Sequence, residues 1–290
     1  MGKIPATNIF AGRILKKPLE GGHLWRCRAC HLFFKWPRLK KSERDALYAL
    51  GVEYAWGSVP SERPDWQIAR KWLHEVLPKG SRVLDLGCSD GGFLNYAGAS
   101  FHCFGAEIHP NARQRARAKG INIIAEDFEH ISYESEPLDC VTAFDVIEHH
   151  PQPRRFLEHC RDLVKPGGWI VISTGNADSP SFRFMGPGYW YCTIAEHMSF
   201  INLKWCYEVA AELRLLINKH IKFSHGNRDI LHYPVELLKN ALYRLVPSLS
   251  VQLRLRGYGK KDAKTHSELA GYPPSWMAAK DHFLMLFSRQ

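Results

Sequence analysis

The sequence lacks any apolar run that approaches the roughly 20 residues needed to span a bilayer. Its first residues do not contain the apolar region of a secretion signal either. Its eight cysteines are scattered, mostly within apolar segments, which is typical of buried thiols rather than of a disulfide framework. These absences argue against a membrane-spanning or a secreted, disulfide-stabilised protein, and we expect a cytoplasmic one.

The charge balance is the first positive signal. The 290 residues include 39 Lys and Arg against 29 Asp and Glu, a net charge of +10. Such a balance favours anionic partners: nucleic acid, anionic lipid headgroups or a phosphorylated substrate. The apolar content of 45% is ordinary for a soluble globular chain, which has room for one α/β domain of about 200 residues plus appended segments.

A glycine-rich turn follows the first clear strand signal. The β-type run Val83 to Leu86 leads into Gly87 and Gly91, and helix-compatible residues start at Phe93. A strand, a tight turn and a helix N-terminus form the usual cofactor site of α/β proteins. We expect unpaired N–H groups of this turn and helix to face an anionic group of the ligand.

Strands and helices alternate along the rest of the chain. Strands are expected at 83–86, 101–106, 121–125, 139–144, 169–173, 215–223 and 281–288, and helices at 64–76, 110–119, 153–164 and 203–213. The glycine-rich segment 165–168 is expected to close the third of these helices. Alternation of this kind predicts a parallel sheet with helices on both faces.

Two segments interrupt this pattern. The stretch 174–200 is rich in Gly, Pro, Ser and aromatic residues and is long for a connection, so we expect a substrate-facing lid. The stretch 224–280 contains a helical apolar stripe beside Lys239 and Arg244. The stripe consists of Val235, Leu238, Leu242, Leu245 and Val246.

A Cys-x2-Cys turn lies near the N-terminus. Cys27 and Cys30 stand in a predicted short hairpin and form half of a four-ligand zinc site. The other half is missing, because the next cysteine is Cys88, inside the glycine-rich turn. His23 and His31 could complete a site, although His31 directly follows Cys30. A zinc-free knuckle and a zinc site both stay open, and the zinc-free one is favoured.

The glycine spacing discriminates between cofactors. A dinucleotide site needs G-x-G-x-x-G, but the glycines here fall at 87, 91 and 92. Asp85 at the end of the strand would oppose a pyrophosphate and would suit an ammonium group. S-adenosylmethionine carries both an ammonium and a carboxylate. Glu107, 20 positions after Gly87, can accept hydrogen bonds from two ribose hydroxyls, and Asp127 with Phe128 can contact an adenine.

The motifs in order resemble a known family. The segments 84–91, 107, 126–128, 144–149 and 163–168 look like successive motifs of the class I S-adenosylmethionine-dependent methyltransferases. The Glu-His pairs at 148–149 and 196–197 resemble the branch of ubiquinone-pathway O-methyltransferases and bacterial glycan-modifying enzymes. The resemblance covers about residues 65–223 and 281–290. The chain departs from the family pattern at two points. Ser89 stands where the family usually has a glycine, and the N-terminal knuckle lacks the first of the two cysteine pairs that relatives with such a module often carry.

The resemblance implies a fold, a domain plan and a cofactor site. It implies an α/β fold with a Rossmann-like, mostly parallel seven-stranded sheet and helices on both faces. The expected parts are an N-terminal knuckle segment (1–64), the core (65–223), a basic amphipathic insert (224–280) and a last core strand (281–290). The expected S-adenosylmethionine contacts are Asp85, Gly87, Cys88, Ser89, Gly91, Glu107, Ile108, Asp127, Phe128 and Phe144.

Methyl transfer to a hydroxyl group gains from a base that takes its proton. The candidates are His149 and His197, with Glu148 and Glu196 as orienting carboxylates. The expected acceptor is a small molecule such as a quinone precursor, or a glycan or lipid-linked sugar.

Two other functions stay open. The charge and the knuckle would also suit an RNA methyltransferase. However, the strand expected at 139–144 is not followed by the Asn/Asp-Pro-Pro-aromatic motif of amino-directed nucleobase methylases. Nucleic acid is therefore disfavoured as a partner. A non-catalytic protein that binds S-adenosylmethionine is the second alternative. The basic insert further suggests contact with an anionic surface at the inner membrane face.

Overall fold

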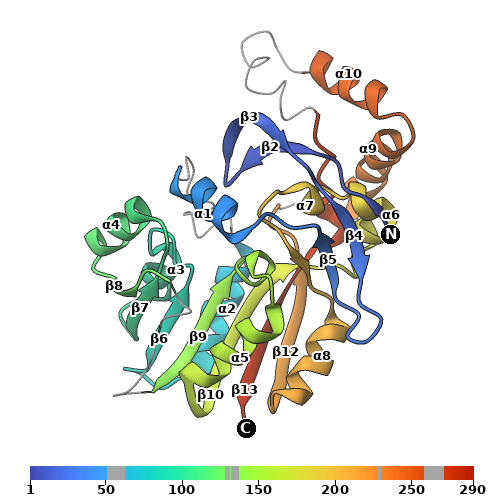
Figure 1. Ribbon diagram of the computed structural model, residues 1–290. Helices are drawn as coiled ribbons and strands as arrows, with labels where there is room; N and C mark the ends of the chain where they lie inside the picture. The colour runs from blue at the N-terminus through green and yellow to red at the C-terminus, as the bar shows by residue number, and fades with distance from the viewer. Residues whose placement is uncertain (51–62, 128–130, 132–136, 227–229, 258–270) are drawn as a thin grey trace.

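A computed structural model describes the chain except for residues 51–62, 128–130, 132–136, 227–229 and 258–270. Its centre is a seven-stranded sheet of order β12-β13-β10-β9-β6-β7-β8 (Figure 1). The strands are β6 (Arg82–Leu86), β7 (His102–Ala106), β8 (Asn122–Ala125), β9 (Leu138–Phe144), β10 (Val164–Gly175), β12 (Leu215–Phe223) and β13 (His282–Arg289). Only β13 runs antiparallel to its neighbours. The expected mostly parallel seven-stranded sheet is confirmed.

Helices cover both faces of this sheet, so its central strands are buried on both sides. One apolar cluster joins the sheet to α5 (Pro153–Leu163) and α8 (Leu203–Glu212). The second joins it to α2 (Pro64–Val76), α3 (Gly92–Ala97) and α4 (Pro110–Ala118). Proline at the first position of α2, α4 and α5 fits these starts, because that position needs no N–H donor.

One predicted boundary was wrong. The glycine-rich segment 165–168 was expected to close a helix before a strand from Trp169, whereas β10 already starts at Val164. Pairing with β9 shifts register between Val164 and Trp169. The glycines therefore form an irregular extension of the strand rather than a free turn.

The N-terminal segment is attached to the core through a second, four-stranded sheet. It contains β1 (Gly2–Lys3), β4 (His23–Arg26), β5 (Phe33–Trp36) and β11 (Ser199–Phe200), in the order β1-β4-β5-β11. The hairpin β4–β5 confirms the short hairpin expected around Cys27 and Cys30. A further hairpin of β2 (Thr7–Phe10) and β3 (Arg13–Leu19) and the helix α1 (Lys41–Ala49) complete this part.

The stretch 174–200, expected to be a substrate-facing lid, is largely buried. It folds into α6 (Pro180–Met185), the 3-10 turn η4 (Gly186–Gly188) and α7 (Trp190–Thr193). Phe182, Tyr189 and Tyr191 are buried in a cluster with Ile4 and Leu24 of the N-terminal segment. The aromatic residues of this stretch are thus the core between the N-terminal segment and the sheet.

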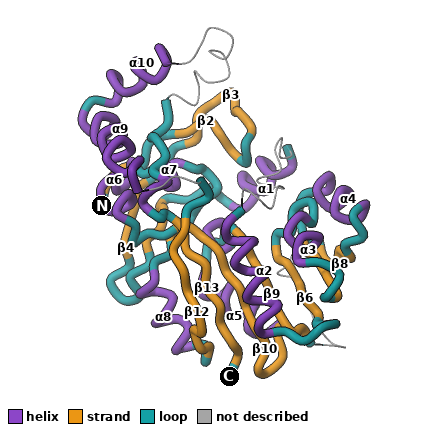
Figure 2. Tube along the Cα trace, turned by 180° about the vertical axis from the view of Figure 1, so that it is seen from behind, coloured by secondary structure: helices purple, strands orange, loops and turns teal. Residues whose placement is uncertain are grey.

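The insert before the last strand projects from the molecule (Figure 2). It contains the 3-10 turn η5 (Ile230–His232), α9 (Tyr233–Leu245), α10 (Pro247–Gly257) and the 3-10 turn η6 (Met277–Ala279). The expected helical stripe is therefore confirmed as a helix, α9.

Candidate active site

The glycine-rich turn after β6 has a left-handed backbone at three positions. Gly87 and Gly91 have φ angles of +70° and +74°, and Ser89 has +49°. A Cβ at Gly87 would lie 2.7 Å from Val146 Cγ2, and one at Gly91 would lie 2.7 Å from Ile121 Cγ1. Both glycines are thus required by conformation and by space. Ser89 adopts the same left-handed conformation, although its Cβ atom disfavours it.

Several N–H groups of this turn are used within the protein. Gly87 and Cys88 donate to Ala106 O at 2.8 and 3.1 Å. Gly91 donates to Cys88 O, and Gly92 to the Asp90 carboxylate at 3.1 Å. These four donors hold the turn together. That the other N–H groups of the turn and of the six-residue helix α3 face an anionic ligand group stays a prediction.

Glu107 connects two loops of the cofactor side. Its carboxylate accepts from Ser89 N and from His109 N, both at 2.8 Å. It is buried at the end of β7, and each oxygen keeps a second lone pair for a ligand hydroxyl. The structure therefore places Glu107 against the glycine-rich turn, as a ribose-binding carboxylate requires.

The other expected cofactor contacts lie along the same edge of the sheet. Ile108 is half exposed just after β7, and Asp127 is partly buried just after β8. Phe144 ends β9, and its ring lies 4.4 Å from that of Phe93, centroid to centroid. Phe128 lies outside the described residues.

Asp85 and Cys88 are more enclosed than a ligand contact suggests. The Asp85 carboxyl is 3% exposed and accepts from Thr142 Oγ1 at 2.6 Å. Burial raises its pKa to about 7. Burial also raises the pKa of the Cys88 thiol, which is therefore unreactive. Cys88 can contact a cofactor through its backbone, but its side chain packs inward.

A charged network that sequence reasoning missed lies beside β9. Arg63 donates to both oxygens of Asp65, at 3.0 and 2.6 Å, and to Asp145 Oδ2 at 2.9 Å. Asp145 follows β9 in a left-handed conformation, φ +56°. Burial opposes its ionisation, but Arg63 and His225 hold the pKa of this carboxyl well below its usual range. The signal available in the sequence was an arginine directly before a Pro-Asp helix start.

The two candidate histidines lie together. His149 ends the 3-10 turn η3 (Ile147–His149), and its ring centroid is 4.7 Å from that of His197. His197 Nδ1 lies 3.1 Å from Tyr191 O, and Tyr48 Oη lies 3.5 Å from His149 Nδ1. Burial lowers the pKa of His149 to about 4 and that of His197 well below its usual range. Both rings are therefore neutral at pH 7.

The carboxylates expected to orient these histidines bond elsewhere. Glu148 accepts from Thr174 Oγ1 at 2.8 Å and from the Tyr191 hydroxyl. Glu196 Oε1 accepts from Ala11 N at 2.9 Å, while its Oε2 is buried without a partner. Neither forms the carboxylate–histidine pair that their spacing suggested. Buried hydroxyl and amide donors compete for these carboxylates, and local sequence does not show those donors.

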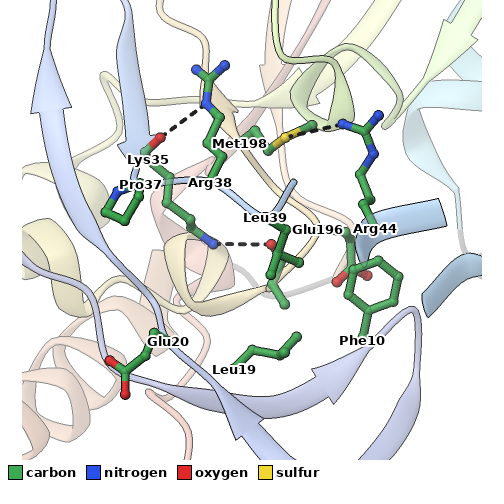
Figure 3. A pocket seen from close by; sticks show the side chains of 11 residues that line it. Phe10, Leu19, Glu20, Lys35, Pro37, Arg38, Leu39, Arg44, Glu196 and Met198 are labelled. Carbon is green, nitrogen blue, oxygen red and sulfur yellow. Dashed lines mark hydrogen bonds between the residues drawn. The ribbon is translucent and has the colours of Figure 1, made fainter. Parts of the chain in front are cut away.

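Figure 3 shows the contact between the N-terminal segment and Glu196. A void of about 20 Å³, roughly the size of one water, lies there. The Lys35 ammonium is buried and donates to Ile194 O at 2.9 Å, and burial lowers its pKa to about 8. The N-terminal segment thus closes the histidine side of the site.

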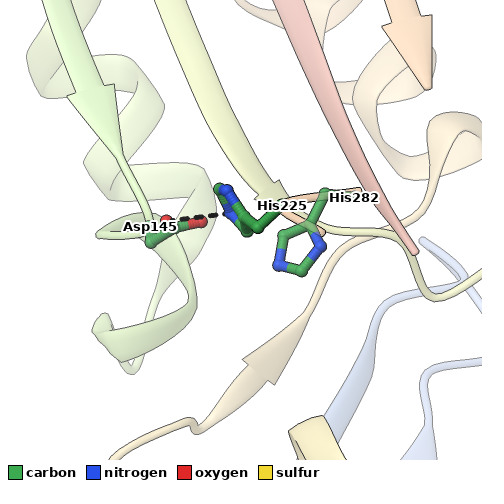
Figure 4. A group of neighbouring side chains, drawn as sticks. All are labelled: Asp145, His225 and His282. Carbon is green, nitrogen blue, oxygen red and sulfur yellow. Dashed lines mark ion pairs between the residues drawn. The ribbon is translucent and has the colours of Figure 1, made fainter. Parts of the chain in front are cut away.

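Two groups of side chains have the donors of a metal site. One is Asp145, His225 and His282 (Figure 4), and the other is Glu148, His149 and His197. In each group the ligand atoms lie within 4.8 Å of one another. In the first group, however, Arg63 already balances the charge of Asp145. His282, absent from our candidates, is oriented by Asp281 through Nδ1 at 2.9 Å.

The cysteine knuckle does not gain ligands in the described part of the chain. Neither potential metal group there includes Cys27 or Cys30. His31 instead lies 3.1 Å from Arg26 through Nδ1 and 3.8 Å from Glu208 through Nε2. The knuckle remains a two-cysteine half-site.

Known structures share this fold. Coclaurine N-methyltransferase, solved with N-methylheliamine and SAH, is 12% identical with a TM-score of 0.53, covering 82% of this chain and 74% of that one. Geranyl diphosphate C-methyltransferase from Streptomyces coelicolor A3(2) is 13% identical with a TM-score of 0.50, covering 77% and 79%.

The sequence relatives are methyltransferases as well. The ubiquinone biosynthesis O-methyltransferase of Paraburkholderia phytofirmans is 37% identical over 135 residues, which are 43% of this chain and 57% of the relative. That of Leptothrix cholodnii is 29% identical over 189 residues, 56% of this chain and 80% of the relative. The chain spans about three fifths of the length of the first relatives. The model of the methyltransferase domain matches residues 62–210, just over half of the 290 residues. The chain therefore belongs to the S-adenosylmethionine-dependent methyltransferase family.

Proposed function

We propose that this chain methylates a hydroxyl group of a small-molecule acceptor, such as a quinone precursor or a lipid-linked sugar. The observation that carries the proposal is the pair of neutral imidazoles beside the cofactor edge of the sheet, that of His197 buried and that of His149 partly exposed. A neutral imidazole is the form that takes a proton from a hydroxyl. The O-methyltransferases among the relatives support the same acceptor atom.

The residues of the site fit S-adenosylmethionine. A Cβ at Gly87 would fill the space beside Val146, so the turn leaves room for close approach. Glu107 would accept from the ribose hydroxyls, and Arg63, which is paired with Asp65 and Asp145, would supply the cation for a carboxylate. When bound, the cofactor supplies an electrophilic methyl group on a sulfonium. The ammonium group would need Asp85 ionised, and its positive charge would lower the raised pKa of that carboxyl.

The protein's own part is to orient the acceptor and accept its proton. Donation from His197 Nδ1 to Tyr191 O leaves Nε2 as the acceptor nitrogen. Tyr48 lies against His149, and the neighbouring Glu196 accepts from Ala11 N, so the N-terminal segment packs beside the histidines. Tyr48 lies outside the matched domain 62–210.

Methyl transfer is tested by S-adenosylhomocysteine formation with catechols, polyprenyl phenols and lipid-linked sugars. We expect His197→Ala to lower kcat about 10²-fold or more at unchanged cofactor Kd, since it removes a base. Glu107→Ala should instead weaken cofactor binding. His102→Ala, an exposed histidine at the start of β7, is the matched control.

Full activity of both the His149→Ala and His197→Ala variants would remove these residues from the mechanism. Tight cofactor binding with no acceptor methylated would favour the non-catalytic alternative. Methylation of tRNA, with a salt-sensitive gel shift, would favour the RNA alternative.

A further inference from the structure

Helices α9 and α10 expose most of their leucines. On α9, Leu238 is 70% exposed and Leu245 is 77% exposed. Seven further apolar residues on or beside these two helices are exposed: Leu231, Val235, Leu237, Val246, Leu249, Leu253 and Leu255. Together with Leu238 and Leu245 they are called the leucine surface. Soluble monomers rarely expose contiguous apolar patches of this kind unless they bind something.

The polar face of α9 is the buried one. Glu236 is 2% exposed and accepts from Ala278 N at 2.8 Å through Oε2. Asn240 is 1% exposed and donates from Nδ2 to Glu236 O at 2.9 Å. Positions 235, 238, 242 and 245 recur at helical spacing on the opposite side. The buried hydrogen bonds thus fix α9 with its apolar stripe facing outward.

The charge of the helix pair has one sign. Residues 231–256 contain Lys239, Arg244, Arg254 and Arg256, against the single acid Glu236, which is buried. Arg244 lies over the Phe184 ring, 5.0 Å from its centroid, and so anchors α9 to α6. Arg254 is partly buried and donates to Tyr272 O, so the exposed Lys239 and Arg256 are the basic side chains that this helix pair offers to an anionic surface.

We propose that the leucine surface binds a bilayer that contains anionic lipids. Its apolar side chains would enter the interface, and its basic side chains would meet the headgroups. A second copy of the chain would cover the leucines only by bringing two sets of like charges together. In the described part of the chain no helix is long and apolar enough to cross a membrane.

This binding goes beyond the proposed chemistry, because it needs neither cofactor nor acceptor. Both views show α9 and α10 at the far side of the N-terminal segment from α5 and α8 (Figures 1 and 2). The leucine surface can therefore meet a bilayer while the seven-stranded sheet stays in water.

The test is co-sedimentation with phosphatidylcholine vesicles, with and without phosphatidylserine. The full chain should bind the anionic vesicles at about 0.1 M salt and lose most of this binding at about 1 M, where charges are screened. Leu238→Asp with Leu245→Asp should weaken binding about tenfold or more, and so should Lys239→Glu with Arg256→Glu.

Two matched controls make the same changes elsewhere. Tyr207→Asp with Leu216→Asp replaces side chains that are 48% and 49% exposed on α8 and β12. Lys71→Glu with Arg117→Glu changes the net charge equally, on α2 and α4. Both should bind as the unchanged chain does, and circular dichroism checks that every variant is folded.

The proposal fails if the full chain ignores anionic vesicles, or if the controls lose binding as much as the leucine variants. It also fails if light scattering shows a dimer that Leu238→Asp with Leu245→Asp dissociates, without any lipid binding. In that case a second copy occupies the surface.

Discussion

Single residues determine the conformation of the glycine-rich turn after β6. Glu107, Gly87 and Gly91 lie where their spacing suggested, but several N–H donors of the turn are used internally. Arg63 and Asp145 place a buried ion pair beside this turn. Ser89 is the residue at which local conformational preference and the observed backbone conflict.

Ser89→Gly should stabilise the protein. A non-glycine residue at φ +49° is strained by about 1 kcal/mol, and glycine removes that strain. The gain should raise Tm by a few degrees in thermal unfolding. Ser89→Ala, which keeps the Cβ, should give no gain. A Ser89→Gly variant that melts at or below Ser89→Ala would show that the hydroxyl, not the backbone, matters here.

Acid should destabilise the chain partly through His149. Its pKa is about 4 in the folded state, below the unfolded value, so the unfolded chain takes up the proton first as pH falls. Its contribution is present above pH 6.5 and is lost between pH 6.5 and 4. The free energy of unfolding, measured with urea at pH 6.5 and at pH 4, should therefore change by about 2 kcal/mol less in His149→Gln than in the unchanged chain. This difference is smaller than the full pKa shift would give, because His149 keeps partial contact with solvent.

His102→Gln, at an exposed position, is the control for this measurement. An equal pH dependence in the His149 and His102 variants would mean that His149 is protonated in the folded state.

Elements follow local sequence except where neighbouring segments compete. Strand β12 covers Leu215–Phe223 as expected, and the helix α2 starts at its proline as expected. Strand β10 starts five residues earlier than Trp169, because pairing with β9 overrides the glycines. Helix α9 formed as expected, yet Glu236 and Asn240, not its leucines, face the protein. The periodicity of apolar residues predicts that a helix has an apolar face, but it does not show whether that face packs on the core or faces solvent.

At the largest scale, the N-terminal segment (1–64) contacts the core closely. Strand β5 pairs with β11, and Ile4 packs in the cluster that holds Tyr191 and Phe200. The N-terminal segment and the methyltransferase core therefore share one core, and we expect them to unfold together.

Ile4→Ala tests this coupling. Ile4 is fully buried, so its truncation should cost about 2–4 kcal/mol, against less than about 0.5 kcal/mol for Ile14→Ala on the exposed hairpin. Tryptophan fluorescence and S-adenosylhomocysteine binding should report the same lowered midpoint. Two separate transitions in Ile4→Ala would show instead that the N-terminal segment folds by itself.

The sequence by itself determined the fold class, the cofactor turn and Glu107. These depend on strand–turn–helix chemistry and on residues that are neighbours in the chain or one strand apart. The partners of Glu148 and Glu196, the contact of Arg63 with Asp145 and the outward face of α9 emerge only from the folded chain. They depend on buried hydrogen bonds and ion pairs between distant segments, such as Glu196 with Ala11, which leave no periodic trace in the chain.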